Sequence, residues 1–139
     1  MDTFKELHHY LTDYTQFYMT VVDFEVKKLS AILNNDLKEI EKNILLQQAF
    51  LMKIEAKERG RLKFTQSLGF DNQSLKVIIE SHTGVEQTQL IKIYDNLSQI
   101  ILDIQHYNKK SMELAQMNLR LFQTDAMKNE EASSNLGSW

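Results

Sequence analysis

The sequence contains no cysteine and no proline, and only four glycines occur among its 139 residues. Without cysteine the chain has neither a disulfide framework nor a thiolate metal site. Proline and glycine are the residues that most often mark short strands and tight turns, and both are scarce here. The composition therefore predicts long helices.

The chain also lacks an excess of positive charge, because 16 Lys and Arg stand against 19 Asp and Glu and the net charge at pH 7 is −3. Affinity for nucleic acid comes mainly from Lys and Arg that neutralise phosphates, so we expect no nucleic-acid partner. The basic residues between 57 and 63 alternate with Glu55 and Glu58 and indicate a solvated helix face. No stretch approaches the ~18 apolar residues of a membrane span. Residues 1–9 lack the basic-then-apolar pattern of a signal peptide, which leaves the cytoplasm as the expected location.

Apolar residues recur at steps of three and four between residues 3 and 33, which predicts a first long helix. Asn34, Asn35 and Asp36 interrupt the pattern, and Asp36 with Glu39 forms a variant of the capping box. A second helix is predicted over 37–68, with Gly60 marking a bend and Gly69 in the position of a C-terminal cap. The short connection predicts an antiparallel hairpin.

A short helix of two turns is predicted next, capped by Asp71 or Asn72 and ending near Gly84. The last helix runs from about residue 85 to at least Phe122 and carries apolar heptad positions. We therefore expect an all-α fold, an antiparallel helical bundle or hairpin of three long helices plus one short helix. Residues 1–125 form one domain in this interpretation, and residues 126–139 form a mobile C-terminal tail.

Candidate catalytic groups are few. His9 and Asp13 share a helix face and would be able to share a metal, but an exposed pair near a helix end is the favoured interpretation. No Glu-x-x-His pair, glycine-rich phosphate loop or nucleophile elbow occurs. The aromatic residues between Tyr10 and Phe24 indicate core packing. We expect no enzyme, no cofactor and no metal site, and metal analysis would test the alternative of a metal or small-ligand bundle.

The last helix changes character after Ser111. Seven of the twelve residues from Ser111 to Phe122 are apolar, and they cover more than about 200° of the helix circumference. Leu114, Met117 and Leu121 form a second apolar stripe beside the first. One neighbouring helix is unable to bury so wide an apolar arc, so we expect part of it to be a binding surface for a partner protein. The flexible methionine side chains suit such a surface. Burial among the other helices and self-association are the alternatives.

The chain resembles the FlgN-type flagellar export chaperones over nearly its whole length. The residues that carry the resemblance are the long first helix, the break at Asn35-Asp36-Leu37, the run from Ile54 to Arg59 and Ser67-Leu68-Gly69-Phe70, with the long last helix. The resemblance implies a chaperone that binds the C-terminal helical segment of hook-associated proteins in the cytoplasm. It would prevent premature assembly and deliver the cargo to the export apparatus.

In that family the cargo surface lies on the last helix. The resemblance therefore places partner-binding residues at Ile104, Tyr107, Asn108, Ser111, Met112, Leu114, Ala115, Met117, Asn118, Leu121 and Phe122. Three alternatives stay open at this point: a coiled-coil adaptor that forms homodimers through the same surface, an export chaperone for a different cargo, and a different bundle with similar spacing.

Overall fold

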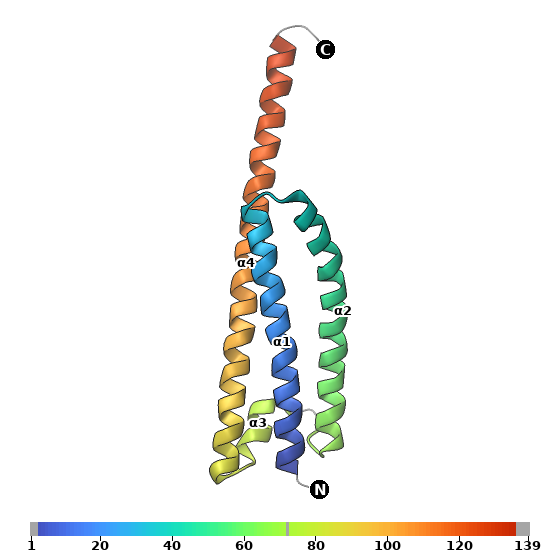
Figure 1. Cartoon of the computed structure of the whole chain (residues 1–139), viewed down its shortest axis with the longest axis vertical. Coiled ribbons are helices and arrows are strands. Elements are labelled where there is room, and N and C mark those ends of the chain that lie inside the picture. Colours follow the sequence, from blue (N-terminus) through green and yellow to red (C-terminus); the bar gives the residue numbers. More distant parts are fainter. Residues whose placement is uncertain (1–2, 72, 136–139) are drawn as a thin grey trace.

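The structure is a computed structural model that describes residues 3–71 and 73–135. Side chains are described for these residues except 125, 126 and 128–135. The chain forms α1 (Thr3–Leu33), α2 (Leu37–Ser67), α3 (Leu75–Glu80) and α4 (Gly84–Asn135), and no strand occurs in the described residues (Figure 1). The predicted all-α fold of three long helices and one short one is confirmed.

The ends of the hairpin helices form as their sequences predict. The side chain of Asp36 accepts a hydrogen bond of 3.2 Å from the Glu39 amide and caps α2. The Asp36 amide itself donates to the Ala31 carbonyl, at 3.1 Å, which closes the end of α1. At the other end of α2, Gly69 has a φ of 87°, a left-handed conformation in which only glycine avoids steric cost. Both predicted caps are confirmed.

One predicted boundary differs from that of the structure. The cap of α3 is Ser74, whose Oγ accepts a hydrogen bond of 3.3 Å from the Val77 amide, so Asp71 is not the cap. The other predicted candidate, residue 72, lies outside the described residues. Helix α4 continues to Asn135, in agreement with the predicted extent to at least Phe122, since no proline or glycine occurs between residues 125 and 135. The mobility of residues 126–139 and the domain boundary at residue 125 stay predictions.

Helix α1 lies at the centre of the bundle and packs against both α4 and α2, while α3 packs against α4. One buried cluster joins α1, α3 and the start of α4 and consists of Leu7, Leu11, Ile78, Ile79 and Leu90. A second cluster joins the middle of α1 to α4 and consists of Tyr14, Tyr18, Val21, Leu97 and Ile100. The aromatic side chains of α1 therefore contribute to the core, as predicted.

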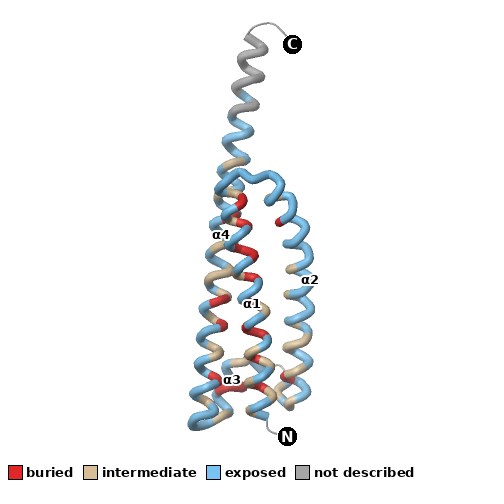
Figure 2. Tube along the Cα trace, viewed as in Figure 1, coloured by how far each residue is buried: buried red, intermediate tan, exposed pale blue. Residues whose placement is uncertain are grey.

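The backbones of helices α2 and α4 do not approach each other closely. In the part of the chain that the structure describes, no Cα atom of α2 lies within 8 Å of one in α4. Figure 1 shows α1 between them, with α3 at the end of the bundle near the N-terminus. The half of α2 that is farther from α3 is almost entirely exposed (Figure 2). This open side is the feature that positions the candidate site.

Candidate partner-binding surface

Exposed apolar side chains gather on α4 at the end of the bundle far from α3. They are Met112, Met117, Leu119, Leu121, Phe122 and Met127, and each is between 55% and 71% exposed. Figure 1 shows that α4 extends past the connection between α1 and α2 at this end. No described helix therefore covers the apolar side of α4 beyond that connection.

The predicted partner-binding residues divide into two groups. Four of them face the bundle or lie at its edge close to α1: Ile104, Tyr107, Asn108 and Ser111. Ser111 is only 2% exposed, and Asn108 Oδ1 accepts a hydrogen bond of 3.0 Å from Lys28 Nζ. In the folded bundle Ser111 is therefore not accessible to a partner, and a role for it in partner binding stays a prediction.

The other predicted residues lie where a partner can reach them. Met112, Ala115, Met117, Leu121 and Phe122 are exposed, while Leu114 and Asn118 are half-buried at the edge of the α1 interface. Leu114 and Met117 line a hollow of about 340 Å³ together with Leu29 and Leu33 of α1. The second apolar stripe of α4 is therefore open to solvent, except for Leu114, which is half-buried beside the end of α1.

The first half of α2 carries a second exposed apolar surface, which the sequence interpretation missed. Its members are Leu37, Ile44, Leu45, Leu51 and Met52, and each is between 52% and 74% exposed. The signal was present in the two apolar runs, residues 44–46 and 50–52. Three consecutive apolar residues on a helix point in three directions, so one neighbouring helix is unable to cover them.

A hollow of about 430 Å³ lies between α1, α2 and α4 at this end of the bundle. It is lined by Lys28, Ile32, Asn35, Leu37, Ile40, Asn43, Ile44, Gln47, Ala115 and Asn118. Asn43 is 6% exposed, and its Nδ2 has no hydrogen-bond partner among the described residues. A buried amide group without a hydrogen-bond partner lowers the stability of the fold. This wall of the hollow therefore lacks an acceptor for Asn43 Nδ2.

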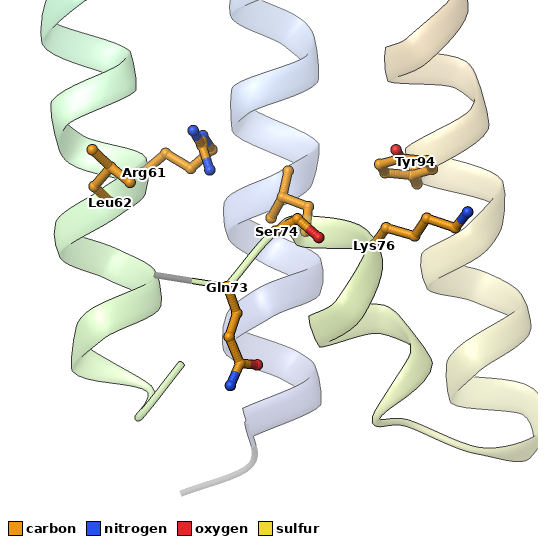
Figure 3. Close-up of a pocket in the computed structure, with 7 residues that line it drawn as sticks. Arg61, Leu62, Gln73, Ser74, Lys76 and Tyr94 are labelled. Carbon is orange, nitrogen blue, oxygen red and sulfur yellow. The ribbon is translucent and has the colours of Figure 1, made fainter. Parts of the chain in front are cut away.

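A second hollow of about 470 Å³ lies between α2 and α4 next to α3. Figure 3 shows Arg61 of α2 on one side and Tyr94 of α4 on the other, with Ser74 and Lys76 between them. Both hollows therefore follow the side on which α2 and α4 fail to meet. The residues that line them include three cations, Lys28, Arg61 and Lys76, and no carboxylate.

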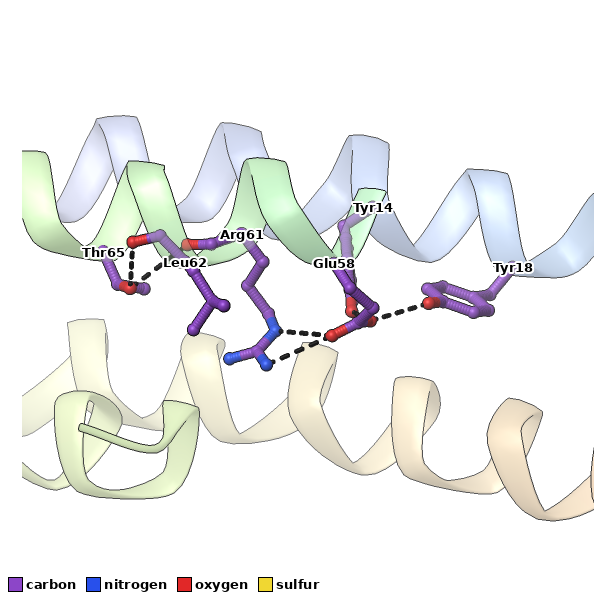
Figure 4. Close-up of polar contacts among 6 residues, drawn as sticks. All are labelled: Tyr14, Tyr18, Glu58, Arg61, Leu62 and Thr65. Carbon is purple, nitrogen blue, oxygen red and sulfur yellow. Dashed lines mark hydrogen bonds and ion pairs between the residues drawn. The ribbon is translucent and has the colours of Figure 1, made fainter. Parts of the chain in front are cut away.

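A polar cluster joins α1 to α2 beside the second hollow (Figure 4). Tyr14 and Tyr18 donate hydrogen bonds to Glu58 Oε1, and the Tyr18 bond is 2.8 Å long. Arg61 donates through Nε and Nη2 to Glu58 Oε2, both at 3.1 Å. The expectation that this part of α2 is a solvated face is therefore wrong for Glu58 and Arg61, because Glu58 accepts hydrogen bonds from α1 and Arg61 pairs with Glu58.

The cluster perturbs the protonation of its members. Burial opposes ionisation of Glu58, but the hydrogen bonds from Tyr14, Tyr18 and Arg61 outweigh it and hold the pKa of the carboxyl below its ordinary value. Burial raises the pKa of Tyr18 to about 12, and the bond to Glu58 adds to the shift. The hydroxyls thus stay protonated and the carboxylate stays charged at neutral pH, which suits a structural tie between two helices.

A buried ion pair lies farther along α1. Lys28 Nζ is 2.7 Å from Glu25 Oε2, and the two side chains are only 11% and 10% exposed. His9 and Asp13 are close, at 3.3 Å, but both are exposed. Among the described residues no group of three or more His, Cys, Asp and Glu side chains is placed to hold a metal ion.

Comparison with known proteins returns no relative: no family model, no curated protein and no solved structure matches the chain. Over its described residues, no helix combines the length and apolar content that crossing a bilayer requires. The chain is thus a helical bundle with an uncovered apolar surface. Its function has to be argued from that surface and from the sequence resemblance.

Proposed function

We propose that this chain is a cytoplasmic chaperone of bacterial flagellar type III export. It binds the C-terminal helical segment of hook-associated proteins, keeps them from assembling prematurely and delivers them to the export apparatus. The resemblance to the FlgN-type chaperones supplies the cargo class and the pathway. The uncovered apolar surface of α4 supports the binding role.

The observation that carries the proposal is the exposure of three large apolar side chains on one helix. Met117, Leu121 and Phe122 are 57%, 59% and 71% exposed, and Met117 lies at the end of α1 beside Leu29 and Leu33. Burying each would contribute roughly 1.5–3 kcal/mol. The three together contribute about 4.5–9 kcal/mol. Because association itself costs several kcal/mol, further contacts with the partner are needed to reach the ~8 kcal/mol of a micromolar complex.

The binding mode is helix against helix. An amphipathic segment lays its apolar face on an apolar surface, and its polar face stays in water. Methionine side chains are flexible and polarizable, so the surface adapts to more than one cargo sequence. A segment covered in this way is unavailable for pairing with its assembly partners, and no covalent step is needed.

The double variant Met117→Glu with Leu121→Glu tests this function. It places two carboxylates in the stripe, so binding of purified hook-associated protein, measured by calorimetry, should fall at least about tenfold. Far-UV circular dichroism should stay unchanged, since both side chains are exposed. The matched control is Gln116→Glu with Gln123→Glu, which adds the same charge at exposed positions on another face of α4. Equal binding by both double variants would contradict the proposal.

Self-association is the second candidate, favoured by the same observation. An amphipathic helix that its own chain leaves uncovered is able to pair with a second copy of itself. Light scattering over a range of concentrations separates the two. A chaperone converts to a heterocomplex when cargo is added, whereas a constitutive homodimer keeps its mass.

A further inference from the structure

Helix α1 has a third side, which neither α2 nor α4 covers. Phe24 stacks on Phe50 of α2, and Val21 belongs to the cluster buried against α4. Val26 lies about 200° around the helix from Phe24 and about 140° from Val21, so it points away from both neighbours. It is 41% exposed. On this side apolar residues recur at alternating steps of three and four: Met19, Val22, Val26, Leu29 and Leu33.

Helix α4 continues this open side. The two helices run in the same direction (Figure 1), and the hydrogen bond from Lys28 to Asn108 puts residues that differ by 80 in number at one level. A hollow of about 340 Å³ lies between the helices here, and its lining includes Leu29, Leu33, Leu114 and Met117. The stripe of α4 also has alternating steps of four and three: Asp103, Tyr107, Lys110, Leu114 and Met117. We call the two stripes together the outer face.

The outer face is open to solvent and has the spacing of a helix-packing surface. Met19, Leu33 and Met117 are 52%, 61% and 57% exposed. Alternating steps of three and four keep side chains on the seam between two packed helices. A second copy of the chain carries the same spacing on the same two helices, and a two-fold axis lets such a face cover itself.

We propose that the outer face binds the outer face of a second copy of this chain. The two copies are antiparallel and form a four-helix arrangement, in which α1 packs on α1 and α4 on α4. The dimer follows from this face alone, whether or not the proposed function holds. Leu114 and Met117 also belong to the surface proposed for cargo, so cargo and a second copy exclude each other there.

Two charged residues within the stripe of α4 are complementary to each other. Asp103 and Lys110 are seven residues apart and therefore share one side of the helix. Asp103 accepts a hydrogen bond from the neutral Gln99, and no ion pair is found for Asp103 or Lys110 among the described residues. When two copies of α4 pack antiparallel about a point midway between these residues, Lys110 of each copy meets Asp103 of the other. Both charges of the stripe are then paired.

The stripe of α1 gives the same position for the two-fold axis. The midpoint between Asp103 and Lys110 lies between residues 106 and 107, which is the level of residues 26 and 27 on α1. Val26 is the middle residue of the α1 stripe, so it meets its own counterpart there, and Met19 meets Leu33. The apolar spacing of one helix and the charges of the other therefore agree on one axis.

A parallel dimer fits the charges less well. Its two-fold axis would run along the helices, so α1 of one copy would pack on α4 of the other at the same level. Asp23, on the rim of the α1 stripe, would then lie beside Asp103, and Lys110 would lie beside Ser30. Like charges placed opposite each other oppose association, so the antiparallel dimer is favoured.

Cross-linking tests the position of the axis, because the chain has no cysteine of its own. Val26→Cys places a thiol beside its counterpart, whereas Lys27→Cys, the matched control, places one at an exposed position on another side of α1. With a short bismaleimide, Val26→Cys should give at least about tenfold more covalent dimer than the control. Met19→Cys should be linked only when it is mixed with Leu33→Cys.

Light scattering tests the charge pairing. The mass of the wild type should rise from the 16.3 kDa of one chain toward twice that value as its concentration rises. Lys110→Asp sets two carboxylates against each other and should raise the dissociation constant of the dimer at least about tenfold. Asp103→Lys combined with Lys110→Asp exchanges the two charges and should restore the dissociation constant to within about threefold of the wild type. Far-UV circular dichroism should be the same for all variants.

Four results would overturn the inference. The first is a mass that stays at one chain up to about 500 μM, which would mean that no second copy binds. The second is a dimer in which Val26→Cys and Lys27→Cys are linked equally, because another face would then pair. The third is an exchanged variant that stays as weak as Lys110→Asp. The fourth is a monomer in which the C-terminal peptide of a hook-associated protein slows alkylation of Val26→Cys, since the outer face would then bind cargo.

Discussion

Tyr18 of α1 and Glu58 of α2 are joined across the helix interface by a hydrogen bond of 2.8 Å, in which the hydroxyl donates to Oε1. Aromatic pairs flank this bond along the same interface: Tyr10 with Phe64, whose ring centroids are 4.1 Å apart, and Phe24 with Phe50, at 4.8 Å. Apolar stacking tolerates sliding, whereas a directional hydrogen bond to a charged group does not. The bond therefore restricts the rotation of α2 against α1 at Glu58.

We expect Glu58→Gln to lower the free energy of unfolding by about 1–2 kcal/mol, because it weakens four charge-assisted hydrogen bonds. The carboxylate side chain is 41% exposed, so solvent reduces the loss below that of a buried group. Urea denaturation followed by circular dichroism measures it. The control is Glu55→Gln on the exposed side of α2, which should change the stability by less than about 0.5 kcal/mol.

The lowered pKa of Glu58 predicts that the stability of the fold depends on pH. The pKa of Glu58 is lower in the folded chain than its ordinary value of 4.5, so the stabilisation it gives is fully present above that value. It is lost as the pH falls below 4.5 toward the depressed pKa. The urea midpoints of the wild type and Glu58→Gln should therefore differ at pH 7 and converge in acid. A constant difference down to pH 3 would contradict the assignment.

Breaking the buried ion pair of Glu25 and Lys28 should lower the stability by more than Glu58→Gln does. Lys28→Ala leaves the Glu25 carboxylate buried without its cation and removes the donor to Asn108, so we expect a loss of about 3 kcal/mol. The double variant Glu25→Gln with Lys28→Met removes both charges, so it should recover much of the stability that Lys28→Ala loses. Thermal melts compare the two, with Lys27→Met on the exposed side as the control. Equal losses in single and double variants would show that charge is not the cause.

Truncating a leucine to alanine should have different effects on stability in the core and on the candidate surface. Leu11 is fully buried, so Leu11→Ala should cost about 2–5 kcal/mol, whereas Leu121→Ala should cost less than about 0.5 kcal/mol. Both variants remove the same three carbon atoms from a leucine on a long helix. A matched loss at the two positions, measured by urea denaturation, would mean that Leu121 is covered in solution by another part of the chain or by a second copy.

Part of the candidate site could be predicted from the local sequence pattern. The wide apolar arc after Ser111 predicted exposed apolar residues on the last helix, and Met117, Leu121 and Phe122 are indeed exposed. The arc did not reveal which part of the circumference faces α1. Ser111 and Asn108 therefore appeared available to a partner, although α1 buries the first and binds the second through Lys28.

The role of α2 was harder to predict. Glu58 looks like a solvated charge, because its partners Tyr14 and Tyr18 lie 44 and 40 residues away in sequence, and Arg61 follows it through their ion pair. The apolar runs of its first half look like ordinary core, because nothing local reveals that α4 lies too far away to cover them. Both errors have the same origin, since periodicity gives the faces of a helix and not its neighbours.

The sequence alone determined four helices, two of their caps and the apolar excess of α4, because helix propensity, capping and hydrophobic spacing act over a few residues. Only the tertiary structure decided that α2 and α4 stay apart, that Glu58 ties α2 to α1 and that two separate hollows remain between α2 and α4. Those features depend on contacts between residues far apart in the chain, where the geometry of packing selects which apolar faces are covered.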